Sequence, residues 1–250
     1  MSITVLVLVI IEIIMLIGIP VAAVLLLKRK WGLPLSIAIA GAVTFIGSQV
    51  LHIPANFLLA SVFDMQAQPL IVQAVILGLS AGIFEEVARY IVYRFWQKDV
   101  RNWQEATSFG LGHGAVEAIL IGLIVALTLV NMVVIANADD PAALGLPEGA
   151  LAQVQEFWSM PHYTPALAVF ERIMAMVLHI SLATMVALCF SKHTIWPLFA
   201  AIVWHAFANA VAVTVAQTWG NVASEGALAV IALFSVGLLW LIRKALPEAE

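Results

Sequence analysis

Four apolar segments of this sequence carry ionisable or strongly polar side chains in their interiors. These side chains are Glu85, Glu86 and Arg89, then His113 and Glu117, then Glu171, Arg172 and His179, and finally His205 and Asn209. Within each segment, members of the set lie four or seven positions apart, so each segment would present one polar face as a helix. An ionisable group inside a bilayer costs a few kcal/mol or more, which makes these residues candidates for chemistry.

The four polar faces also reach a similar depth. Counted from the nearest Lys or Arg at the basic end of each segment, Glu86 lies eight residues in, His113 twelve, and His179 and His205 thirteen. With a rise of about 1.5 Å per residue, these side chains lie roughly 12 to 20 Å from the same boundary. If the four helices are neighbours, we expect one convergent site near the midplane, in the half of the membrane closer to the basic residues.

The charges of this set do not balance. Its four carboxylates accompany only two arginines, so about two negative charges stay uncompensated if every group is ionised. Either some carboxyls are protonated, or a divalent cation is bound. His113, His179 and His205 together with Glu86 form a known inventory of zinc ligands, in which three protein ligands leave a position for water. A water molecule held by zinc, or by Glu and His side chains, is a plausible nucleophile at neutral pH.

Simpler interpretations of the same residues stay open. Arg89 and Arg172 could serve only to neutralise neighbouring carboxylates. We interpret Glu117 and Glu171 as partners that orient a histidine, in preference to metal ligands or bases. Asn209, or any one membrane histidine alone, could simply bridge two helices. Three histidines at one depth beside an acidic cluster favour a functional site.

The composition indicates that lipid surrounds most of the chain. Apolar residues make up 63% of the 250 residues and charged residues 10%, and the mean hydropathy is +1.05. A soluble domain of this size needs a far more charged surface. Stretches long enough to span a bilayer run at about Ile3–Leu27, Leu33–Leu51, Leu70–Trp96, Ala106–Ala136, Ala166–Phe190, Ile195–Gln217 and Ala227–Ile242. We predict an all-α, polytopic helical bundle with about seven transmembrane helices, in one domain over residues 1–250.

The basic residues predict the orientation of this bundle. Nine of the eleven Lys and Arg residues lie at or just beyond span ends, and alternation of the spans brings all nine to one side. The opposite connections, about 52–69, 137–165 and 218–226, contain neither Lys nor Arg. The positive-inside rule then predicts an N-terminus outside and a C-terminus in the cytoplasm.

Several features are assigned outside the site. Leu151–Met160, with Phe157 and Trp158, is typical of a helix at the membrane interface. Glu12 stands alone in the first span and has no assigned partner. The glycines near the polar residues of the third and fourth spans are interpreted as helix-packing surfaces. Three histidines fall in loops or at span ends and are expected to be solvated: His52, His162 and His193.

Four sequence motifs coincide with the polar faces: EEVARY (Glu85–Tyr90), FGLGHGAVEAI (Phe109–Ile119), ERIMAMVLHISL (Glu171–Leu182) and HAFAN (His205–Asn209). Together they resemble the YhfC family of predicted intramembrane metalloproteases, which looks related to the CAAX-prenyl-protease and bacteriocin-processing (CPBP) proteases. The CPBP pattern is a Glu pair with a trailing Arg, then FxxxH, then HxxxN. This chain matches the second and third elements but spaces the first as EExxR, not EExxxR. The general-base position therefore falls on either Glu85 or Glu86.

The resemblance covers a motif-bearing core at about residues 70–215 and implies hydrolysis of a peptide bond in or near the bilayer. By analogy with the CPBP proteases, Glu85 or Glu86 would activate water, and His113 and His205 would bind metal or polarise the scissile carbonyl. Asn209 would help to stabilise the oxyanion. In a glutamate-type mechanism the same Glu and His residues would orient water without zinc.

We therefore predict an intramembrane endopeptidase in the plasma membrane of a bacterium or archaeon, with Zn²⁺ as cofactor or with none. Its expected partners are membrane lipid and a peptide or membrane-protein substrate; nothing indicates nucleic-acid binding or defines an oligomeric state. A proton- or cation-coupled transporter is the alternative, although no Gly/Pro break near the polar cluster and no internal repeat support it. A third possibility is a non-catalytic membrane scaffold or binding protein.

Overall fold

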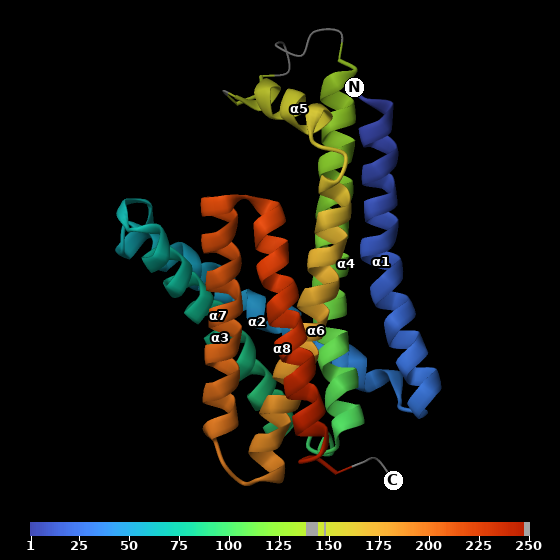
Figure 1. Ribbon diagram of the computed structural model, residues 1–250, viewed down its shortest axis with the longest axis vertical. Helices are drawn as coiled ribbons and strands as arrows, with labels where there is room; N and C mark the ends of the chain where they lie inside the picture. Colours follow the sequence, from blue (N-terminus) through green and yellow to red (C-terminus); the bar gives the residue numbers. More distant parts are fainter. Residues whose placement is uncertain (139–144, 148, 248–250) are drawn as a thin grey trace.

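The computed structural model describes residues 1–138, 145–147 and 149–247, and this part of the chain is helical (Figure 1). Its elements are α1 (Ile3–Trp31), α2 (Leu35–Val62), the 3₁₀ helix η1 (Met65–Ala67), α3 (Leu70–Phe95), α4 (Trp103–Ala136), α5 (Ala150–Ser159), α6 (Thr164–Ser191), α7 (Trp196–Trp219) and α8 (Asn221–Arg243). No β-strand occurs among the described residues, so the all-α prediction is confirmed for them.

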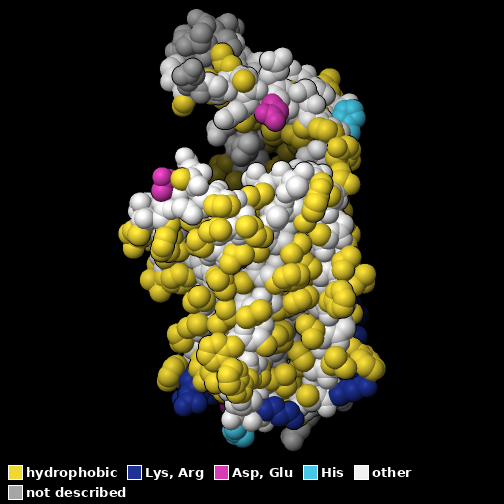
Figure 2. Space-filling model, turned by 60° about the vertical axis from the view of Figure 1, so that its left-hand side comes forward, with side chains coloured by type: hydrophobic (Ala, Val, Ile, Leu, Met, Phe, Trp, Pro, Cys, Tyr) yellow, Lys and Arg dark blue, Asp and Glu magenta, His cyan; other side chains and the backbone are white. Residues whose placement is uncertain are grey.

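Seven of these helices, all except α5 and η1, are long and apolar enough to cross a membrane. Their outward side chains are apolar as well; Leu123, Ile124 and Leu127 of α4 are between 48% and 66% exposed. Figure 2 shows a broad band of hydrophobic side chains above the Lys and Arg side chains at one end. Such a surface is unfavourable in water and suits a bilayer. The chain is an integral, multi-pass membrane protein, as predicted.

Two predicted span boundaries are wrong. The second span does not end at Leu51, because α2 continues through Pro54 to Val62. A proline inside a helix removes one backbone hydrogen bond, and membrane helices tolerate this loss. The last span does not begin at Ala227, because α8 starts at Asn221, and a single residue separates it from α7. The expected connections at 52–69 and 218–226 are therefore mostly helical.

α4 lies at the centre of the bundle and packs against α1, α2 and α6, while α3 packs along α7. Backbones approach closely where α4 crosses α2. A Cβ atom added to Gly112 would lie 2.0 Å from the carbonyl oxygen of Ala38, and one added to Gly41 would lie 2.0 Å from that of Phe109. These glycines are helix-packing positions, as predicted for Gly112, and they hold the adjacent His113 against α2.

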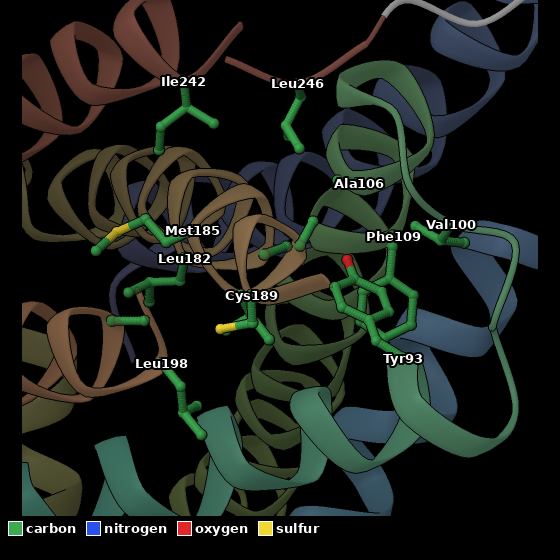
Figure 3. Close-up of a cluster of buried hydrophobic side chains, with 14 of the residues drawn as sticks. Tyr93, Val100, Ala106, Phe109, Leu182, Met185, Cys189, Leu198, Ile242 and Leu246 are labelled. Atoms are coloured by element: carbon green, nitrogen blue, oxygen red, sulfur yellow. The ribbon is translucent and has the colours of Figure 1, made fainter. Parts of the chain in front are cut away.

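A cluster of buried apolar side chains fills the end of the bundle that carries the basic residues (Figure 3). The rings of Tyr93 and Phe109 lie 4.6 Å apart within it, and Leu182 of α6 is fully buried beside them. The free thiol of Cys189 is buried in the same cluster. This packing separates the polar residues of the bundle from its basic end.

A second apolar cluster lies at the other end of the bundle, where α5 packs across the ends of α1 and α4 (Figure 1). Its buried members are Val5, Val9, Leu129, Val154 and Trp158. The helix predicted at Leu151–Met160 is confirmed as Ala150–Ser159. Residues 139–144 and 148 of the predicted 137–165 connection lie outside the described residues.

Candidate metal centre and cavity

Glu86 is fully buried and lies between a basic side chain and a histidine. One of its carboxylate oxygens bonds Arg89, one turn further along α3. The other lies 2.9 Å from Nδ1 of His205 on α7. The Glu86 carboxylate therefore balances the Arg89 guanidinium and orients the His205 ring.

Glu85 points about 100° away from Glu86 around α3 and meets different neighbours. Its Oε2 lies 3.1 Å from Nε2 of His113 on α4, and its Oε1 accepts a hydrogen bond of 3.1 Å from the Gln49 amide on α2. Both arginines of the polar set pair with other carboxylates. Glu85 is therefore the member of the glutamate pair that remains available to a ligand.

Three histidines from three helices lie side by side next to these glutamates. The ring centroids of His113 and His179 are 4.7 Å apart, and those of His179 and His205 are 5.4 Å apart. All three residues are at most 3% exposed. Nε2 of His179 lies 2.8 Å from Oε2 of Glu117, which orients this ring as the sequence suggested. The structure thus brings together histidines that are up to 92 positions apart in the chain.

One carboxylate and two imidazoles form a group that could hold a metal ion. A ligand atom from each of Glu85, His113 and His179 lies within 4.8 Å of the other two, and all three residues are buried. Catalytic zinc sites use this ligand set and leave a further position for water. Nδ1 of His113 is buried without a hydrogen-bond partner in the described part of the chain, and such atoms often belong to sites that an ion or water completes. The residues present therefore fit a divalent ion.

This group differs from the ligand set suggested by the sequence. Glu85 occupies the place given to Glu86, and His205 lies outside the group, bonded to Glu86. The two glutamates differ in depth by only about 1.5 Å, so their rotation about the helix axis decides which one faces His113 and His179. The spacing of the motif contains no information on that rotation relative to the neighbouring helices.

Charged side chains continue from His179 towards the end of the bundle remote from the basic residues. Arg172 lies two turns before His179 on α6 and pairs with Glu117 at 2.8 Å and also with Glu171. These three side chains are 15% to 37% exposed, compared with 4% for His179, so access increases in this direction. Arg172 neutralises carboxylates as expected, whereas Glu171 bonds this arginine and does not orient a histidine.

A cavity of about 100 Å³ connects these groups. Its polar lining consists of Glu85, Glu117, Glu171, Arg172, His179, His205 and Asn209. A buried water molecule needs about 10–15 Å³ on this measure, so several water molecules fit. Water can therefore stand next to the candidate metal ligands.

The prediction that His52 is solvated is wrong. His52 lies in α2, is 8% exposed, and its ring nitrogens lie 3.1 Å from Oε1 of Gln49 and 3.0 Å from Nδ2 of Asn56. The signal was present in the sequence, because positions 49, 52 and 56 share one face of a helix. Ending the second span at Leu51 hid that face.

A further acidic residue near the cavity was also missed. Glu225, near the start of α8, is 7% exposed and interacts electrostatically with Glu171. Its position near the predicted end of a loop gave no reason to place it in the bundle. Glu12 is buried on α1 and does not line the cavity. His162 and His193 are exposed, as predicted.

The model of a family described as YhfC intramembrane metalloprotease matches residues 13–232, which include the whole candidate site. The chain belongs to this family. A YhfC relative from Bacillus subtilis (strain 168), described as an uncharacterized membrane protein, is 28% identical over 232 residues, which cover 90% of each chain. No solved structure matches the chain significantly. The YhfC match begins within α1 and ends within α8, so it includes parts of all seven helices that could span a membrane.

Proposed function

We propose that this protein is a metal-dependent intramembrane protease that hydrolyses a peptide bond in or near the bilayer. The observation that carries the proposal is the buried group of Glu85, His113 and His179 beside a polar cavity within a membrane-spanning bundle. Membership of a family described as intramembrane metalloproteases supports the same activity. The FxxxH and HxxxN motifs further support a relation to the CPBP proteases.

Glu85, His113 and His179 would hold the ion, and Zn²⁺ is the first candidate because it favours imidazole and carboxylate ligands in sets of three. A bound divalent ion supplies an activated water and polarises the scissile carbonyl. Glu117 accepts a hydrogen bond from Nε2 of His179, which leaves the lone pair of that ring on Nδ1. This nitrogen lies 3.5 Å from a guanidinium nitrogen of Arg89, so a bound ion would replace that contact.

His205 is the proposed proton carrier. Glu86 accepts a hydrogen bond from Nδ1–H of His205, so the lone pair lies on Nε2, and the ring lines the cavity. During hydrolysis the water oxygen bonds the carbonyl carbon and the C–N bond breaks, while Nε2 accepts the water proton and passes it to the leaving amine. Asn209, one turn further along α7, would donate to the oxyanion. In a mechanism without metal, Glu85 would accept the proton instead.

The direction of access favours a substrate that arrives at the end remote from the basic residues. The apolar cluster around Tyr93 and Phe109 blocks the basic end, whereas Glu171 exposes its side chain at the other end of the cavity. If the basic end lies in the cytoplasm, as the positive-inside rule predicts, the N-terminus is outside and the site opens outward. We infer one membrane domain, with a membrane-proximal or membrane-embedded peptide as substrate.

Continuous helices distinguish this proposal from a transporter. The site-bearing helices α3, α4, α6 and α7 carry no proline beyond their first two positions. Transporter sites often use helices that are broken at the substrate. A non-catalytic scaffold of the same fold would bind peptides without cleaving them.

Metal analysis and cleavage together test the proposal. The purified protein, loaded with Zn²⁺ and desalted, should retain about one equivalent. The variants Glu85→Gln, His113→Ala and His179→Ala should lose it, while the exposed-site control His193→Ala should keep it. Membranes from cells that express the wild type should contain new peptide termini that are absent with Glu85→Gln. Retention of zinc by all three site variants, or identical termini in both membranes, would reject the proposal.

A further inference from the structure

Polar side chains of α2 and α3 form a hydrogen-bonded chain that leads to Glu85. Oδ1 of Asn56 accepts a bond of 2.6 Å from the Ser80 hydroxyl, and Nδ2 of Asn56 lies 3.0 Å from Nε2 of His52. Nδ1 of His52 lies 3.1 Å from Oε1 of Gln49, whose amide nitrogen bonds Glu85 at 3.1 Å. Four side chains thus follow one another without a gap.

The Glu85 carboxylate dictates the direction of every bond in this chain. An ionised carboxylate can only accept, so Gln49 must turn its NH₂ group towards Glu85 and its carbonyl towards His52. His52 must then carry its proton on Nδ1, and its Nε2 accepts from the Asn56 amide. The Asn56 carbonyl finally accepts from the Ser80 hydroxyl. Each donor therefore points towards Glu85.

Burial shows that this chain ends inside the protein. His52 is 8% exposed and stacks on Phe84, with ring centroids 5.5 Å apart, and Ser80 is 6% exposed. A proton path to bulk water would need an exposed end, and the terminal hydroxyl is buried. The chain is suited to holding a side chain in place, because each member is fixed by the next.

We propose that Gln49 is a positioning residue for Glu85, and that His52, Asn56 and Ser80 fix Gln49 in the required orientation. The Gln49 amide donates a hydrogen bond to Oε1 of Glu85, so Oε2 is directed at His113 within the candidate metal group. The expected effect of Gln49 on metal affinity rests on the proposed function, because it requires that Glu85 binds a metal ion. The predicted tautomer of His52 does not depend on any metal.

The tautomer gives the first test. In full-length protein labelled with ¹⁵N-histidine, the His52 signal is identified by its loss in His52→Phe. The expected result is a neutral ring with its proton on Nδ1 in the wild type, and a mixture of tautomers in Gln49→Met, which has similar size but no amide. A proton on Nε2 of His52 in the wild type would reject the proposed direction of these hydrogen bonds.

Zinc affinity gives the second test, with the ion alone as the probe. Gln49→Met should weaken binding about 10- to 100-fold, as loss of an outer partner of a ligand typically does. Thr44→Val is the matched control, because Thr44 is buried on α2 and its hydroxyl donates to the Ala40 carbonyl of its own helix, its sole hydrogen bond among the described residues. Wild-type affinity in Gln49→Met would overturn the positioning role and leave the proposed function intact. A wild type that binds no zinc would reject the metal proposal, and the His52 tautomer would still decide the chain.

Discussion

The two sides of α3 at the site differ more than the adjacent positions of Glu85 and Glu86 suggest. On one side, Glu86 is paired with Arg89 and His205 and has no exposed surface. On the other, Glu85 contacts His113 and a neutral amide and borders the cavity. The comparison teaches that one glutamate of the motif balances charge and orients a histidine, while its neighbour borders the cavity and contacts the other histidines of the candidate metal group.

The largest effect is expected on stability at the Glu86 side. Glu86→Gln leaves the Arg89 guanidinium buried without a counter-ion, which should lower the free energy of unfolding by about 3–5 kcal/mol. Thermal unfolding in detergent measures the loss. The double variant Glu86→Gln with Arg89→Met should recover most of the lost stability. An unchanged melting temperature in Glu86→Gln alone would show that Glu86 contributes no more to stability than Glu85 does.

Glu85→Gln should have the opposite profile. The shape of the side chain is kept and no arginine loses its partner, so stability should stay within about 1 kcal/mol of wild type. Zinc affinity, measured by competition with a chelator, should fall by more than about 100-fold, because a direct ligand matters more than its outer partners. Equal losses of stability in Glu85→Gln and Glu86→Gln would contradict the division of roles.

A smaller effect is expected at Glu117, which orients His179 as Glu86 orients His205. The amide of Glu117→Gln can donate to Nε2 of His179 and so favours a proton on Nδ1, the nitrogen needed for a ligand. Zinc affinity should fall about 10- to 100-fold. Glu171→Gln is the matched control, since Glu171 shares the contact with Arg172 and should leave the affinity nearly unchanged.

The smallest effect on stability is expected in the apolar cluster between the site and the basic end of the bundle. The Tyr93 hydroxyl is buried and finds no hydrogen-bond partner among the described residues. Tyr93→Phe should therefore change the free energy of unfolding by less than about 1 kcal/mol, with a gain in stability more expected than a loss. Zinc affinity should not change. A loss of more than about 2 kcal/mol in the free energy of unfolding would mean that this hydroxyl makes a hydrogen bond that the structure does not show.

Most of the fold was predictable because a bilayer restricts a chain to long apolar helices. Hydropathy failed where polar residues interrupt a span without ending it. His52 and Asn56 lower the hydropathy of α2 beyond Leu51, yet they contact Phe84 and Ser80 of α3 in the bundle. Ser224 and Glu225 hid the first turn of α8 in the same way.

The membership of the site was also predictable in large part. Depth and helical spacing led to His113, His179 and His205, and the structure places them together. The choice between Glu85 and Glu86 was not predictable, because it depends on how α3 is rotated against α4 and α6. That rotation is set by packing, including the contacts of Gly78 and Gly82 with α7, where no side chain separates the backbones.

Unequal helix lengths have a consequence for the surrounding lipid. α4 has 34 residues and is about 51 Å long, whereas α7 and α8 have 24 and 23 residues and are about 35 Å long. In Figure 1 the far ends of α1, α4 and α6 extend beyond those of α7 and α8. A hydrocarbon core is about 30 Å thick, so α7 and α8 span it with little excess, whereas α4 extends beyond it. The far end of α4, with α5 packed against it, therefore lies outside the lipid, on the side towards which the exposure of the cavity residues increases.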